Sequence, residues 1–126
     1  MTNNRNNRTL SAGEHRAINV LIVDDSAVMR QVMSGLLSAE RDISVSAASD
    51  PIIAMQKMRS SRPDVILLDI EMPRMDGMTF LQKIMREDPV PVVICSGHAA
   101  RGARLGISAL EAGAIDIITK PELGVK

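Results

Sequence analysis

Several apolar runs of the sequence end in a polar side chain that suits metal or phosphate chemistry. These polar residues are Asp24 and Asp25, Asp69, Ser96 and Lys120. Two carboxylates about 5 Å apart repel by roughly 3 kcal/mol at an effective dielectric constant of about 20. Three carboxylates in one cleft therefore predict either a raised pKa or a bound cation. Because they offer only oxygen ligands, Mg²⁺ is favoured over Zn²⁺, which prefers histidine and cysteine.

The same residue types, taken together, are typical of phosphoryl transfer. An aspartate can accept a phosphoryl group as an acyl phosphate. A cation and an ammonium group then neutralise the phosphoryl oxygens, while a hydroxyl donates a hydrogen bond to one of them. Asp69 is the predicted acceptor, because its strand is central and the turn at 71–77 folds back after it. Each residue alone is ordinary cap or turn chemistry, and only their meeting at one end of one sheet favours a site.

Five short strands with a helix between successive strands would bring these residues together. Apolar runs predict three central strands, at 20–23, 65–68 and 92–95, while weaker patterns predict edge strands at 43–47 and 115–118. The order of elements indicates an α/β protein with a doubly wound, five-stranded parallel sheet in the flavodoxin-like order 2-1-3-4-5. In that order the carboxyl ends of strands 1 and 3 meet at the switch point, where ligands bind.

Apolar residues at helical spacing predict which faces of the helices meet the sheet. The predicted apolar stripes are Val28, Val32 and Leu36 beside Met29, Met33 and Leu37; Ile52, Met55 and Met58; and Met78, Leu81 and Met85 with Phe80 and Ile84 on the flank. A fourth helix at 99–112 is predicted to end at Gly113.

Composition excludes several classes of function. The 126 residues include 15 basic and 15 acidic side chains, so the formal net charge is zero and the basic footprint of a nucleic-acid-binding protein is missing. Phe80 is the only aromatic residue, which excludes a base-stacking platform. No apolar run reaches the roughly 18 residues of a membrane span. The single cysteine, Cys95, cannot form an intrachain disulfide, and we expect a cytoplasmic location.

The chain divides into a short polar segment and one domain. Residues 1–17 are rich in asparagine and arginine and are predicted to be a disordered N-terminal tail, whereas residues 18–126 form the domain. A dinucleotide-binding domain is excluded, because no Gly-x-Gly-x-x-Gly follows the first strand and Asp24-Asp25 would repel a pyrophosphate.

The sequence resembles a two-component response-regulator receiver domain over residues 18–124. The resemblance is carried by Asp24-Asp25-Ser26, by Asp69, by the segment Glu71-Met-Pro-Arg-Met-Asp-Gly77, by Ser96 and by Lys120-Pro121. Longer segments such as VDDSAVMRQVM and ALEAGAIDIITKP are similar to the receiver of the chemotaxis protein-glutamate methylesterase family. This implies a phospho-acceptor switch that receives its phosphoryl group from a chemotaxis-type histidine kinase.

The resemblance also implies a role for each site residue. Asp69 would be phosphorylated, Ser96 would be the switch hydroxyl, and Lys120 would pair with the phosphate. In such receivers the peptide bond between Lys120 and Pro121 is usually cis. Mg²⁺ would be held by Asp25, Asp69 and the backbone carbonyl of Glu71, with Asp24 acting through water. The regulated partners would be a methylesterase/deamidase domain in the same protein and, through it, chemoreceptors.

Two departures from the family pattern define the alternatives. Ile117 stands where receivers commonly have an aromatic residue, so a non-switching interaction module is the alternative function. The chain ends at Lys126, where receivers begin a fifth helix, so we expect an uncovered apolar patch on strands 1 and 5, filled by a continuation of the chain or by self-association. With His15 and His98 as the only histidines, no Ser-His-Asp esterase site is expected in these residues.

Overall fold

The computed structural model describes residues 16–72, 76–97 and 100–122. Strands and helices alternate along the chain: β1 (Ile18–Val23), α2 (Ala27–Ser38), β2 (Ile43–Ala48), α3 (Pro51–Ser60), β3 (Val65–Asp69), α4 (Gly77–Glu87), β4 (Val92–Ser96), α5 (Ala100–Glu111) and β5 (Asp116–Thr119). The five strands form one sheet in the order β2-β1-β3-β4-β5, and every neighbouring pair is parallel. The predicted fold class, strand order and edge strands are confirmed.

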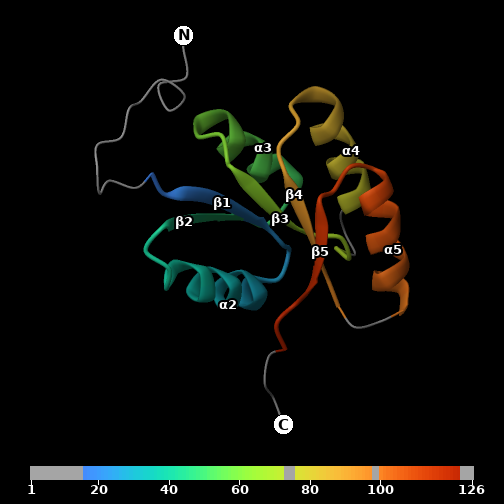
Figure 1. The fold of residues 1–126 in the computed structure, drawn as a ribbon, viewed down its shortest axis with the longest axis horizontal. Coiled ribbons are helices and arrows are strands. Elements are labelled where there is room, and N and C mark those ends of the chain that lie inside the picture. The colour runs from blue at the N-terminus through green and yellow to red at the C-terminus, as the bar shows by residue number, and fades with distance from the viewer. Residues whose placement is uncertain (1–15, 73–75, 98–99, 123–126) are drawn as a thin grey trace.

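The helices cover the two faces of the sheet unequally (Figure 1). Helix α2 lies on one face, where Met29 and Met33 pack with Val20 and Ile22 of β1. Helices α3, α4 and α5 lie on the other face, and their buried side chains form the larger core. Buried apolar area drives this layering, and the central strands are accordingly the most completely covered elements.

The exact helix faces were predicted less well than the helices themselves. In α2 the row that contains Met29 and Met33 is buried, whereas Val28 and Leu36 of the neighbouring row are 54% and 60% exposed. In α3 the prediction for Ile52 was wrong, since its side chain is 70% exposed. In α4 the deepest residues include the predicted flank, Phe80 and Ile84. These short helices carry more apolar residues than there are core positions. Periodicity alone therefore could not tell which of two neighbouring rows faces the sheet.

The sheet face beside α2 is incompletely covered at β5. Ile118 pairs in register with Cys95 on this face and is 40% exposed, as predicted for strand 5. The prediction was wrong for strand 1, because α2 buries Val20 and Ile22. Among the described residues no helix follows β5.

Some predictions concern residues outside the described ranges. These are the tail up to residue 15, both histidines and residues 73–75 of the turn after β3. Arg16 is described, and its guanidinium lies 3.5 Å from the Asp64 carboxylate. No described helix is long and apolar enough to cross a membrane.

Candidate functional site

The polar residues predicted to meet at the carboxyl end of the sheet do meet there. Asp24, Asp69 and Ser96 are all buried, at 1%, 2% and 5% exposure. Carboxylate oxygens of Asp24, Asp25 and Asp69 lie within 4.8 Å of one another. Lys120, which follows β5, places its Nζ 3.0 Å from Asp69 Oδ1 and 3.6 Å from Asp24 Oδ2. The site therefore combines three clustered carboxylates with one ammonium group.

Hydrogen bonds from the backbone orient the two buried carboxylates. Asp24 Oδ1 accepts from the N–H of Ser26 at 2.9 Å, and Asp69 Oδ1 accepts from the N–H of Glu71 at 2.9 Å. The N–H of Lys120 donates to the carbonyl of Ser96 at 2.8 Å, which ties the end of β5 to β4. The bonds to Asp24 and Asp69 arise because the chain turns sharply after each of these residues, so that an N–H two residues later points back at the side chain.

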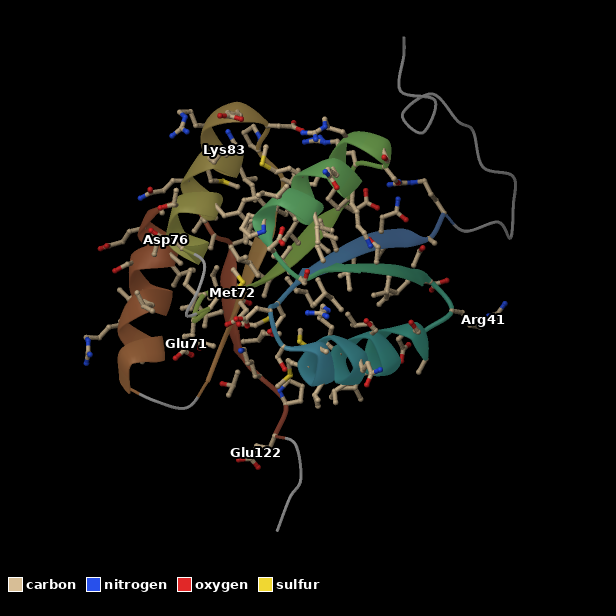
Figure 2. The ribbon with its side chains drawn as sticks, turned by 180° about the vertical axis from the view of Figure 1, so that it is seen from behind. Arg41, Glu71, Met72, Asp76, Lys83 and Glu122 are labelled. Carbon is tan, nitrogen blue, oxygen red and sulfur yellow. The ribbon has the colours of Figure 1, made fainter. Side chains whose placement is uncertain are left out.

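Two helices, α2 and α4, begin next to the site with capped first turns. Ser26 caps α2 by accepting from the N–H of Met29 at 3.1 Å, and Asp76 caps α4 by accepting from the N–H of Thr79 at 3.1 Å. At Gly77 an added Cβ would lie 3.0 Å from the carbonyl oxygen of Asp69. A glycine is therefore required for α4 to begin so close to the end of β3. Figure 2 shows Asp76, Glu71 and Met72 around this turn.

Burial and like charge perturb the titration of this cluster. Burial raises the pKa of Asp24, the hydrogen bond from Ser26 opposes this, and the charge of Asp69 raises the pKa further. Burial alone would lower the pKa of Lys120, but its hydrogen bond to Asp69 and the neighbouring carboxylate charges raise it instead. Lys120 therefore stays protonated and is the fixed positive charge of the site.

The donor set fits a divalent metal ion. Asp24 Oδ2 is buried without a hydrogen-bond partner among the described residues, and its 3.6 Å ion pair with Lys120 is too long for a hydrogen bond. A buried carboxylate oxygen without a partner is costly unless a cation completes its surroundings. Clustered carboxylate oxygens match the preference of Mg²⁺ for hard oxygen ligands.

Cys95 takes no part in this chemistry. Burial raises the pKa of its thiol to about 12, and the charges of Asp24 and Asp69 act in the same direction. A thiol that stays protonated is neither a nucleophile nor a metal ligand. Cys95 instead packs as a small apolar side chain against Met29 and Met33.

Two interactions were missed at the sequence level. Arg30 Nη1 donates to the backbone carbonyl of Asp24 at 2.7 Å, and the Glu71 carboxylate accepts from the N–H of Gly97 at 2.6 Å. Glu71 was predicted to act only through its carbonyl. One implied feature is wrong, since the described residues contain no cis peptide bond and the bond before Pro121 is trans.

The fold and the acidic cluster are those of a signalling module, and comparison with known families agrees. The family model of the response regulator receiver domain matches residues 20–124. The chain therefore belongs to the response regulator receiver domain family.

The relatives of this chain include proteins named for methylesterase and glutaminase activities. The chain is 61% identical over 108 residues to protein-glutamate methylesterase/protein-glutamine glutaminase 1 of Chromobacterium violaceum, covering 85% of this chain and 30% of that protein. The chain is 57% identical over 107 residues to the protein of the same name from Anaeromyxobacter dehalogenans, again covering 85% of this chain and 30% of that protein. The chain thus spans less than a third of the length of these relatives.

A solved structure is similar in both sequence and fold. The response regulator domain of Thermotoga maritima CheB superposes with a TM-score of 0.75 at 41% identity, covering 88% of this chain and 84% of that one. The comparison supports a receiver domain similar to that of CheB.

Proposed function

We propose that the chain is a phospho-acceptor switch in which Asp69 receives a phosphoryl group from a histidine kinase. The observation that carries the proposal is the placement of Lys120 Nζ 3.0 Å from Asp69 Oδ1, beside two further carboxylates. An ammonium group at this distance neutralises charge on a group transferred to Asp69. A site with only a structural role would not need the carboxylates of Asp24 and Asp25 beside Asp69.

Transfer proceeds by in-line displacement at phosphorus. A carboxylate oxygen of Asp69 forms the new P–O bond while the P–N bond to the kinase imidazole breaks, and its electron pair leaves with the imidazole. In this proposal Lys120 donates to the phosphoryl oxygens, and the hydroxyl of Ser96, the last residue of β4, would donate to another. Hydrolysis returns the Asp69 carboxylate and releases inorganic phosphate.

Mg²⁺ is the proposed cofactor of this step. Asp24, Asp25, Asp69 and the carbonyl of Glu71 would hold it, and when bound it supplies charge neutralisation for the transferred group. The Asp24 oxygen without a hydrogen-bond partner supports this assignment.

The biological role we propose follows from the relatives. Proteins of which this chain covers about 30% carry the names methylesterase and glutaminase, so phosphorylation here would regulate such a domain acting on chemoreceptors. The proposal places the chain in the cytoplasm, where a reduced Cys95 is stable.

The direct test is phosphorylation by acetyl phosphate in the presence of Mg²⁺. We expect intact-mass spectrometry to detect one added phosphoryl group that hydroxylamine removes, and no addition to the Asp69→Asn variant. Asp42→Asn, which alters an exposed aspartate in the α2–β2 turn, is the matched control. Uptake by Asp69→Asn at the rate of the unmodified chain would disprove the assignment.

The alternative is a receiver-like interaction module that does not switch. Ile117 favours it, because an aliphatic side chain at this position packs against α5 at Gly106. A titration with Mg²⁺ followed by NMR separates the two functions. A phospho-acceptor should show saturable shifts at Asp25 and Asp69, and an inert module should show none.

A further inference from the structure

The Glu71 side chain connects the turn after β3 to the end of β4. Its backbone N–H donates to Asp69 Oδ1 at 2.9 Å, while its Oε2 accepts from the N–H of Gly97 at 2.6 Å. Figure 2 shows Glu71 between the end of β4 and helix α5. One residue therefore contacts the acceptor aspartate through its backbone and the opposite strand end through its carboxylate.

This carboxylate occupies a position where negative charge is already crowded. Asp24 and Asp69 are buried nearby, and Glu71 is itself partly buried. Its charge is also among those that raise the pKa of Lys120. A carboxylate in such surroundings needs a hydrogen bond to stabilise its charge. Here a backbone N–H supplies a short, charge-assisted one.

A phosphoryl group on Asp69 would compete with the Glu71 carboxylate for the Gly97 N–H that this carboxylate binds and for the Lys120 ammonium whose pKa its charge raises. Lys120 contacts Asp69 directly, and Gly97 immediately follows Ser96 at the same strand end. A phosphoryl dianion and a carboxylate cannot share these donors, because their repulsion would add to that of the acidic cluster.

We propose that the Glu71 carboxylate holds the Gly97 N–H in place of a phosphoryl group in the unphosphorylated chain and is displaced when Asp69 is modified. Glu71 is thus a positioning residue that sets how strongly the site retains a phosphoryl group. The inference rests on the proposed function of Asp69 and adds to it a competitor built into the chain itself.

The test is a titration with beryllofluoride, which mimics a phosphoryl group on aspartate, in the presence of Mg²⁺. Affinity is measured by NMR, with the amide resonance of Gly97 as the local readout. Glu71→Gln keeps an oxygen acceptor for the Gly97 N–H but removes the charge. We expect it to bind beryllofluoride about tenfold more tightly than the unmodified chain, as when a charge-assisted hydrogen bond is exchanged for a neutral one.

The ligand-free spectra separate a positioning role from a general structural one. The Gly97 amide should stay hydrogen-bonded in Glu71→Gln and lose that bond in Glu71→Ala, with the remaining resonances little changed. Glu40→Gln, at an exposed position in the α2–β2 turn, is the control and should match the unmodified chain.

Two negative outcomes have different meanings. Equal beryllofluoride affinities in the unmodified chain and Glu71→Gln, or an unchanged Gly97 amide in Glu71→Ala, would overturn the inference about Glu71 alone. Failure of the unmodified chain itself to bind beryllofluoride would overturn the proposed function of Asp69.

Discussion

The two ends of the sheet differ in how their acidic side chains are paired. At the amino end, Asp64 Oδ2 accepts from the N–H of Asn19 at 2.8 Å, and Asp64 Oδ1 lies 3.5 Å from the Arg16 guanidinium. At the carboxyl end, two buried carboxylates face each other, and Asp24 Oδ2 has no hydrogen-bond partner among the described residues. The first arrangement joins strands, whereas the second places two buried carboxylates beside a single ammonium group.

This difference indicates where the fold sacrifices stability for function. Acidic groups that are fully paired add modestly to stability, while crowded buried acids reduce it. Among the described residues, Lys120 is the cation that pairs with the side-chain carboxylates of both buried acids, so much of the charge balance at the carboxyl end depends on it.

Removal of Lys120 is the strongest test of this contrast. We expect Lys120→Met to lower the free energy of unfolding by about 3 kcal/mol near neutral pH, because Asp24 and Asp69 remain buried without their partner. Urea denaturation measures the loss. Lys83→Met breaks an exposed ion pair with Glu87, and the loss should be far smaller because water screens this pair. Losses of equal size would refute the contrast.

Neutralising Asp24 should raise the free energy of unfolding, whereas removing Lys120 lowers it. Burial raises the pKa of Asp24 in the folded chain, so its ionisation costs stability as the pH rises through that value. We expect Asp24→Asn to stabilise the metal-free chain by about 1–2 kcal/mol at neutral pH. The variant should also lose most of the stabilisation that Mg²⁺ gives the unmodified chain. Thermal unfolding with and without Mg²⁺ tests both parts, and a destabilised metal-free variant would contradict them.

The amino end should behave as ordinary structure. Asp64→Ala removes the acceptor for the Asn19 N–H and the partner of Arg16, and we expect a loss of about 1 kcal/mol. Chemical denaturation reports the change. The response to Mg²⁺ and the uptake of phosphate should not change, and a loss of either would mean that the two ends are coupled.

The smallest effect is expected at Asp76, an exposed acid near the site that acts as a helix cap. Hydrogen bonds from the Thr79 side chain and backbone lower its pKa below the ordinary value of 3.8. The stability it contributes is therefore present above that value and is lost as the pH falls through the lowered pKa. We expect Asp76→Ala to cost about 0.5–1 kcal/mol at neutral pH. Asp76→Asn should retain the cap without the acid dependence, and denaturation at two pH values distinguishes them.

Much of the fold and the core of the site could be predicted from local sequence. Apolar runs such as Val65–Leu68 indicate buried strands, and the polar residue that ends each run lies at the same sheet edge in any parallel arrangement. That reasoning located Asp24, Asp69, Ser96 and Lys120 together without knowledge of the structure.

The remaining features depend on contacts between segments far apart in the chain. Whether Met29 or Val28 faces the sheet is decided by the rotation of α2 on β1 and β2, which periodicity does not determine. The bond from Gly97 to Glu71 spans 26 residues and depends on the course of two turns. The contact of Arg30 with the Asp24 carbonyl likewise follows from the packing of α2, because nothing in residue spacing indicates it.

The close contact between α5 and β5 restricts how related sequences can vary. An added Cβ at Gly106 would lie 2.9 Å from Cδ1 of Ile117, so a side chain at position 106 would require the Ile117 side chain to shift. A larger side chain at either position requires a smaller one, or a shifted helix, at the other. Residues 106 and 117 should therefore covary among relatives, and chains with an aromatic residue at position 117 should carry their α5 further from the sheet.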